Sequence, residues 1–145
     1  HLGEYVENLA LDGGDFIIKR SDGVFAYQLA VVVDDAAMGV NRVVRGRDLL
    51  SSAPRQVWLH RQLGFAPPQF CHVPLLLAAD GKRLAKRERS LDMGALRASC
   101  TAPQLVGWLA WLAGLQPEPR PQHPKQLIAG FDWPLVPKED IVVNT

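Results

Sequence analysis

The sequence predicts an α/β fold with a parallel sheet, and two observations support that prediction. Short runs rich in β-branched residues alternate with helical stretches of about ten residues or more, which is typical of βαβ units. The chain has 145 residues, of which 48% are hydrophobic and 21% are charged, a composition typical of an ordinary folded domain. We therefore expect one compact core and exclude disordered and collagen-like classes.

Strands are expected where β-branched or apolar runs lie beside turn residues. The first covers 15–20, ahead of the turn at 21–23, and a brief one covers 41–44. The apolar run 70–79 predicts a strand buried on both faces, and the turn Asp80-Gly81 follows it.

Two helices are expected between these strands. The three valines at 31–33 favour a strand by propensity, but 27–38 is predicted to be helical because apolar residues recur there at helical spacing: Leu29, Val32, Val33, Ala36 and Ala37. Gly39 then ends the helix. The second helix begins near Ser51, has Pro54 in its first turn and ends at Gly64, with apolar positions at Val57, Trp58 and Leu63.

The second half of the chain is expected to be mainly helical. A short helix is predicted at 91–96 and a longer one over 103–115, whose shared apolar face consists of Leu105, Trp108, Leu109 and Leu112. Four prolines within 116–124 indicate a linker, and the last segment contains the apolar run 141–143.

Bulk charge and cysteine content narrow the function classes only slightly. The net charge is +1, so neither a nucleic acid nor a membrane follows as partner from overall charge. The apolar stretches are far shorter than the roughly 20 residues of a membrane span, and we expect a soluble, cytoplasmic protein. Cys71 and Cys100 lie far apart, without zinc-ligand spacing, so we expect two reduced, buried thiols and no metal site in this chain.

A local cluster of positive charge is the sharpest feature. Residues 82–89 hold five cations directly after a predicted strand. Open α/β folds bind ligands at the carboxyl ends of strands, and ammonium groups there hold polyphosphates and stabilise charge that develops in phosphoryl or nucleotidyl transfer. From charge alone, a solvated turn is the favoured interpretation.

Two further side chains are candidates for ligand binding. Arg45 follows a predicted strand and has the geometry to clamp a carboxylate, although an ion pair with Asp34 or Asp48 explains it equally well. Tyr27 could present its hydroxyl from the first turn of a helix, although an aromatic residue there is more often part of the core.

Acid–base chemistry finds little support in the sequence. We interpret His72 as a packed, hydrogen-bonded histidine, and the adjacent Asp34 and Asp35 diverge by about 100° on a helix and cannot share a site. The P-loop, dinucleotide-binding, zinc-protease and serine-hydrolase signatures are missing from the sequence. What remains is a weak prediction of anion binding.

Ordered strings carry a resemblance to a known family. They run from about Asp15 to Arg87 and include FAYQLAVVVDD at 25–35, VVRG at 43–46, HVPL at 72–75 and GKRLAKR at 81–87. In this the chain resembles the glutamyl-tRNA synthetases, which are class I aminoacyl-tRNA synthetases. The resemblance implies the C-terminal half of a Rossmann-like parallel-sheet catalytic domain over 1–90, followed by a small, mainly helical, stem-contacting region over 91–145.

The resemblance also implies roles for individual residues. Tyr27 and Arg45 match the tyrosine and arginine that hold the substrate glutamate. The segment 83–87, with Arg83, Leu84, Ala85, Lys86 and Arg87, matches the KMSKS loop that binds ATP, and Lys86 stands where the family's lysine stabilises the activation transition state. Arg83 and Ala85 replace the usual lysine and serine, so one hydroxyl bond to the phosphates is lost.

Within the family, the residue string at 25–35 and the end of the chain soon after the basic loop favour a short member that lacks an anticodon-binding domain. This implies activation of L-glutamate by ATP with Mg²⁺, and transfer of the glutamyl group to the queuosine base of tRNA(Asp) by a monomer. The HIGH motif, the other glutamate-binding residues and the zinc-binding cysteines belong upstream of His1. With its start at His1 rather than a methionine, the chain is therefore expected to be a piece of a longer protein, inactive alone.

Two other interpretations stay open. The chain could be the same region of an ordinary glutamyl-tRNA synthetase, which continues into helical anticodon-binding domains. It could also be a non-catalytic remnant that binds tRNA and keeps the fold without the activation site.

Overall fold

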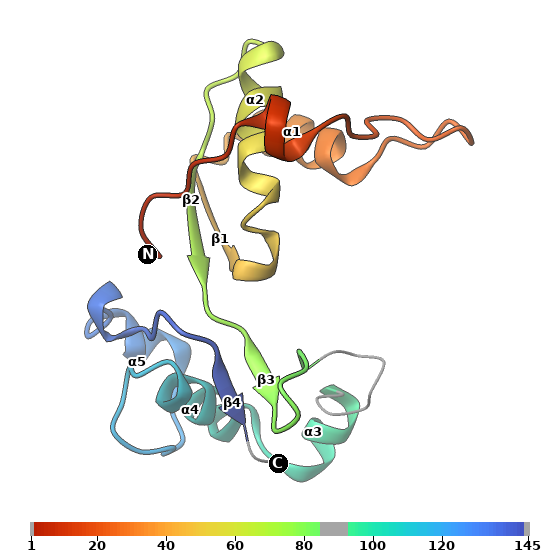
Figure 1. The fold of residues 1–145 in the computed structure, drawn as a ribbon. Coiled ribbons are helices and arrows are strands. Elements are labelled where there is room, and N and C mark those ends of the chain that lie inside the picture. Colours follow the sequence, from red (N-terminus) through yellow and green to blue (C-terminus); the bar gives the residue numbers. More distant parts are fainter. Residues whose placement is uncertain (1, 85–92, 144–145) are drawn as a thin grey trace. The chain divides into compact units, whose positions relative to one another are not determined.

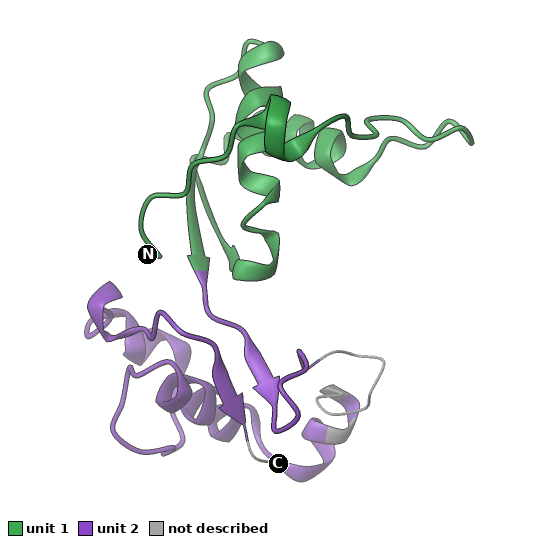
Figure 2. Ribbon diagram, in the orientation of Figure 1, with its two compact units in different colours: residues 1–72 green, residues 73–145 purple. Residues whose placement is uncertain are grey.

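A computed structural model describes residues 2–84 and 93–143. The chain divides into two compact units, His1–His72 and Val73–Thr145 (Figure 2). Each unit has helices and a two-stranded sheet of its own, so the α/β class is confirmed. The functional boundary near residue 90 stays a prediction.

The first unit is a strand–helix–strand arrangement with a second helix against it. Strand β1 (Arg42–Gly46) pairs with β2 (Gln69–Val73), and α2 (Ser52–Gln62) lies between them in the chain. Figure 1 shows the two strands running in the same direction, as a βαβ connection requires. Helix α1 (Tyr27–Ala37) packs against α2. The predicted helices and the predicted strand at 41–44 are thus confirmed.

The core of this unit is small and in part polar. Its buried apolar side chains are Val32, Ala53 and Leu59, and its largest fully buried side chains include Gln56 and His60. Of the apolar positions named for this helix, Trp58 is 44% exposed, and Leu63, also 44% exposed, follows directly after α2. Trp58 instead packs edge-on against the Phe16 ring, with centroids 6.1 Å apart.

Ahead of α1, a π-helical turn (Leu9–Gly13) leads into a hairpin-like loop. The strand predicted at 15–20 was wrong, because only the single bridge Lys19–Phe25 forms there. The chain reverses at Gly23, whose φ is +87°, and Ile17 on the short arm is 67% exposed. Pairing with its own return arm alone gives too few backbone hydrogen bonds to extend a strand.

The second unit is built on another short parallel pair. Strand β3 (Leu76–Ala78) pairs with β4 (Ile141–Val143) so that Leu76 lies opposite Ile141. The prediction of one buried strand over 70–79 was wrong, because β2 and β3 are separate and their residues are mostly half-buried. The break falls at Pro74, which has no N–H to give to a ladder, and at Leu75, whose N–H donates to the Asp140 carboxylate over 2.8 Å.

The described residues of this unit also form the helices α3 (Met93–Ser99), α4 (Ala102–Leu112) and α5 (Pro124–Ile128). Helix α4 begins with a capping box, in which Thr101 and Gln104 bond each other's backbone. The helix expected at 91–96 continues to Ser99, and residues 91 and 92 lie outside the described residues, while α5 was not expected. A short 3₁₀ turn (Trp133–Leu135) precedes β4.

Two smaller expectations also have outcomes. Cys71 and Cys100 are half-buried thiols rather than buried ones. Among the described helices, none combines the length and apolar character needed to cross a membrane.

Candidate carboxylate-binding site

Arg45 lies near the end of β1, and three neutral groups of the first unit hold its guanidinium. Its Nη1 donates to Gln56 Oε1 over 2.7 Å, its Nε to His72 Nε2 over 3.1 Å and its Nη2 to the Leu49 carbonyl over 3.1 Å. The guanidinium also lies 4.8 Å from the centre of the Phe70 ring, a stacked cation–π arrangement. These three bonds leave one N–H on each η nitrogen, and the Tyr27 side chain also hydrogen-bonds the guanidinium.

The short connection after β1 provides this geometry. The chain turns at Arg47–Leu49 in a 3₁₀ turn before α2 begins, which places the Leu49 carbonyl four residues beyond Arg45. His72 and Phe70 come from the neighbouring strand β2. The predicted end-of-strand position of Arg45 is therefore correct.

His72 is a buried, neutral hydrogen-bond acceptor. This agrees with its interpretation from the sequence as a packed, hydrogen-bonded histidine. It is 5% exposed. Burial lowers its pKa, and the positive charge of Arg45 lowers it further, while a hydrogen bond to the Leu49 carbonyl opposes both. Since Arg45 donates to Nε2, the proton of the neutral ring is assigned to Nδ1.

Tyr27 and Arg45 lie together. Burial lowers the pKa of the Arg45 guanidinium, and interaction with the Tyr27 side chain raises it again, as do the charges of Asp35 and Asp48. Tyr27 stands at the start of α1 and is 51% exposed. The two residues proposed for glutamate are thus adjacent, although they are eighteen positions apart in sequence.

A second layer of polar side chains lies behind Arg45. Gln56 Nε2 donates to Gln28 Oε1 over 2.9 Å, and Gln28 Nε2 donates to Ser52 Oγ over 3.0 Å. Sequence reasoning missed all three residues. The available signal was that polar Gln56 and His60 interrupt the apolar pattern of α2, which is the expected pattern where a helix packs over a buried polar group.

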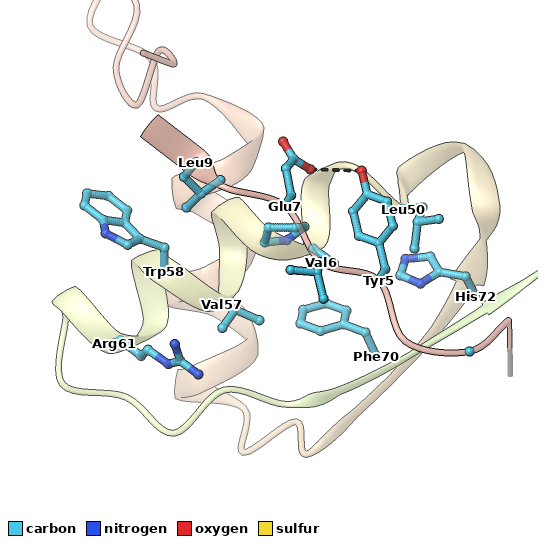
Figure 3. A pocket seen from close by; sticks show the side chains of 13 residues that line it. Tyr5, Val6, Glu7, Leu9, Leu50, Val57, Trp58, Arg61, Phe70 and His72 are labelled. Carbon is cyan, nitrogen blue, oxygen red and sulfur yellow. Dashed lines mark hydrogen bonds between the residues drawn. The ribbon is translucent and has the colours of Figure 1, made fainter. Parts of the chain in front are cut away.

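A separate cavity of about 540 Å³ lies next to this cluster. Residues 3–9 and helix α2 form much of its lining (Figure 3). Phe70 and His72 line it too, and at its rim the Tyr5 hydroxyl donates to Glu7 over 3.0 Å. Arg45 does not line this cavity. Phe70 and His72 do, and both also contact the Arg45 guanidinium.

The basic segment is only partly described. Arg83 forms an antiparallel bridge with Leu77, and the Leu84 N–H donates to the Leu76 carbonyl over 3.1 Å. Ala85, Lys86 and Arg87 lie outside the described residues. Within the described part of the chain, no cluster of three His, Cys, Asp or Glu side chains is suited to hold a metal ion.

The arrangement around Arg45 is suited to holding a carboxylate rather than to moving protons. An arginine that keeps its charge and is fixed in a plane pairs with two carboxylate oxygens at once. The histidine that bonds it, His72, has a lowered pKa and accepts a hydrogen bond from Arg45 Nε.

Comparison with known proteins identifies the family. Residues 5–119 match the family described as tRNA synthetases class I (E and Q), catalytic domain. The chain belongs to this family. The solved glutamate-tRNA synthetase of Elizabethkingia anophelis superposes with a TM-score of 0.71 at 25% identity, over 92% of this chain and 31% of that one.

Curated relatives from this class I family are much more similar in sequence. The glutamyl-Q tRNA(Asp) synthetase of Symbiobacterium thermophilum is 53% identical over 89% of this chain, and that of Nitratidesulfovibrio vulgaris is 55% identical over 90%. The chain spans only 40% of the length of each. A Neisseria gonorrhoeae relative of the same name is 41% identical over 97% of this chain and 48% of its own length.

Proposed function

We propose that this chain forms the glutamate-holding part of a glutamyl-Q tRNA(Asp) synthetase. The complete enzyme would activate L-glutamate with ATP to glutamyl-adenylate and transfer the glutamyl group to the queuosine base of tRNA(Asp). The observation that supports this most directly is the Arg45 guanidinium, held by neutral partners beside Tyr27. The names of the similar curated relatives support the choice of acceptor.

In this proposal, Arg45 binds a carboxylate of glutamate through the N–H groups left on its η nitrogens. The Tyr27 hydroxyl provides a further hydrogen bond from the start of α1. Orientation and charge neutralisation carry adenylate formation, since the attacking carboxylate is already ionised at neutral pH. No acid–base pair is therefore required from this chain.

The basic segment would meet the ATP phosphates. Lys86 would stabilise the charge that develops on them, with support from Arg83 and Arg87 and from the backbone at Leu84 and Ala85. Mg²⁺, when bound to the phosphates, supplies additional charge neutralisation. The described residues offer no cluster of three His, Cys, Asp or Glu side chains for it.

An exchange assay tests the chain alone. We expect no glutamate-dependent exchange of pyrophosphate into ATP, because the curated relatives contain more than half their length beyond the matched region. Glutamate-dependent exchange by these 145 residues would overturn that expectation.

The proposed acceptor of the glutamyl group, the queuosine base of tRNA(Asp), can be tested with a complete enzyme. The chain would be joined to the segment that the Symbiobacterium relative has in addition, and glutamylation would be measured on tRNA(Asp) with and without queuosine. We expect only the modified tRNA to be glutamylated. Equal activity on both would reject the proposed acceptor, and charging of tRNA(Glu) would favour an ordinary glutamyl-tRNA synthetase, the class to which the structural neighbour belongs.

A further inference from the structure

Gln56 is a buried amide whose orientation is set by Arg45. Its side chain is 1% exposed, and its Oε1 lies 2.7 Å from Arg45 Nη1. An arginine has only donors, so the oxygen of the amide must face it. The NH₂ group of Gln56 then faces Gln28, whose own NH₂ group donates to Ser52.

These bonds tie the guanidinium to both helices of the first unit. Gln56 and Ser52 lie one turn apart on α2, and Gln28 lies on α1, which packs against α2. An apolar side chain of similar size would fill the position of Gln56, but it would leave an N–H of a half-buried guanidinium unpaired. Packing alone therefore does not account for an amide here.

The chemical type of the acceptors has a second consequence. Gln56, His72 and the Leu49 carbonyl are all neutral, so the groups that bond the guanidinium add no negative charge to that of the nearby Asp35 and Asp48. A carboxylate at position 56 would orient it equally well but would form an ion pair with it. Such a pair competes with any anionic ligand for the same positive charge.

We propose that Gln56 is a positioning residue for Arg45. As a neutral acceptor held by Gln28, it fixes the plane of the guanidinium and leaves the positive charge for the carboxylate of glutamate. This inference rests on the proposed function of Arg45 in binding glutamate.

The first test measures the guanidinium without ligand. In the chain labelled with ¹⁵N-arginine, NMR reports rotation about the Cζ–Nη bonds and proton exchange at the guanidinium of Arg45. We expect restricted rotation in the wild type and freer rotation in Gln56→Leu, with a smaller effect in Gln28→Leu. Gln62→Leu is the matched control, because Gln62 is exposed on the same helix. An unchanged Arg45 signal in Gln56→Leu would overturn the proposal.

The second test separates orientation from charge. Gln56→Glu keeps an acceptor toward Arg45, and the Gln28 amide can turn over to donate to it, so we expect a folded chain with a restricted guanidinium. In the completed enzyme described above, L-glutamate should bind the Gln56→Glu variant at least about tenfold more weakly than the wild type. Gln62→Glu adds the same charge at an exposed position of α2 and should bind as the wild type does. Wild-type affinity in Gln56→Glu would overturn the role of the neutral acceptor.

The two tests also keep the proposals apart. If L-glutamate added to the completed enzyme leaves the Arg45 signals of the wild type unchanged while Gln56→Leu still frees the guanidinium, the assignment of glutamate to Arg45 fails and the positioning by Gln56 stands.

Discussion

At the scale of single residues, His72 links the site to pH. The folded chain holds this histidine neutral, with a pKa below the ordinary value of 6.5, because of burial and the adjacent Arg45 charge. Protonation would place two cations face to face and remove the acceptor for Arg45 Nε. Since the unfolded chain takes up this proton more readily, the contribution of His72 to stability is present above pH about 6.5 and is lost as pH falls through the lower, folded pKa.

We therefore predict that the free energy of unfolding falls more steeply between pH about 7 and pH about 5 in the wild type than in His72→Gln. Glutamine can accept from Arg45 Nε and donate to the Leu49 carbonyl, but it does not titrate. Denaturant unfolding at several pH values gives both curves, and their difference removes the effect of the other titrating groups. Parallel curves would contradict the prediction.

Arg45 provides a second prediction at this scale. Arg45→Lys keeps the positive charge but cannot reach Gln56, His72 and the Leu49 carbonyl together. We expect loss of detectable L-glutamate binding and a lower free energy of unfolding, by about 1–3 kcal/mol, because buried acceptors lose their donor. Arg42→Lys is the control, since Arg42 is an exposed residue of the same strand that bonds Gln69. Isothermal titration and denaturant unfolding measure the two effects.

At the scale of elements, α4 depends on the absence of a side chain at one position. A Cβ on Gly107 would overlap the Arg120 carbonyl oxygen, which belongs to the loop crossing the helix. Gln116 fastens that loop, because its NH₂ group donates to the Gly107 carbonyl over 2.6 Å and to the Arg120 carbonyl over 3.1 Å. Helix propensity alone would favour alanine at position 107.

We predict that Gly107→Ala lowers the free energy of unfolding by about 1–3 kcal/mol despite the better helix propensity, since the backbone of the loop must move. Gly130→Ala is the control, because a Cβ there meets nothing within 4 Å. Thermal unfolding followed by circular dichroism compares the two. A stabilised Gly107→Ala would show that the loop can move away at little cost.

The elements also show what the sequence could predict. Helical spacing and glycine stops located α1 and α2 to within a residue or two, because Gly39 and Gly64 adopt positive φ at their ends. The sequence did not indicate that Gln56 is buried in α2, because hydropathy ranks Trp58 above Gln56. The Gln56 amide can be buried because it bonds to Arg45, which lies on a strand eleven residues earlier in the sequence. A pattern within one segment carries no information about such a partner.

At the scale of the whole molecule, local sequence patterns could not predict which residues from different elements lie side by side. Residue types and spacing combined Arg45, Tyr27 and the basic segment only into a weak prediction of anion binding, and the family resemblance gave Arg45 and Tyr27 a common ligand. The structure then places them together through the packing of α1 against α2. Similarly, the apolar run 70–79 contains no sign that Val73 and Leu76 belong to different sheets, apart from Pro74.

The division of the chain leads to a prediction for ligand binding. Tyr27, Arg45 and every group that holds them lie within His1–His72. A ligand that binds only the folded state stabilises the part whose opening destroys its site. In the completed enzyme, we therefore expect saturating L-glutamate to slow amide hydrogen exchange in β1, α2 and β2, while the amides of β3, β4 and α4 exchange at their unliganded rates. The Arg45→Lys chain should show no slowing anywhere. Uniform protection of both units in the wild type would mean that they open together, and protection confined to the second unit would move the glutamate site away from Arg45.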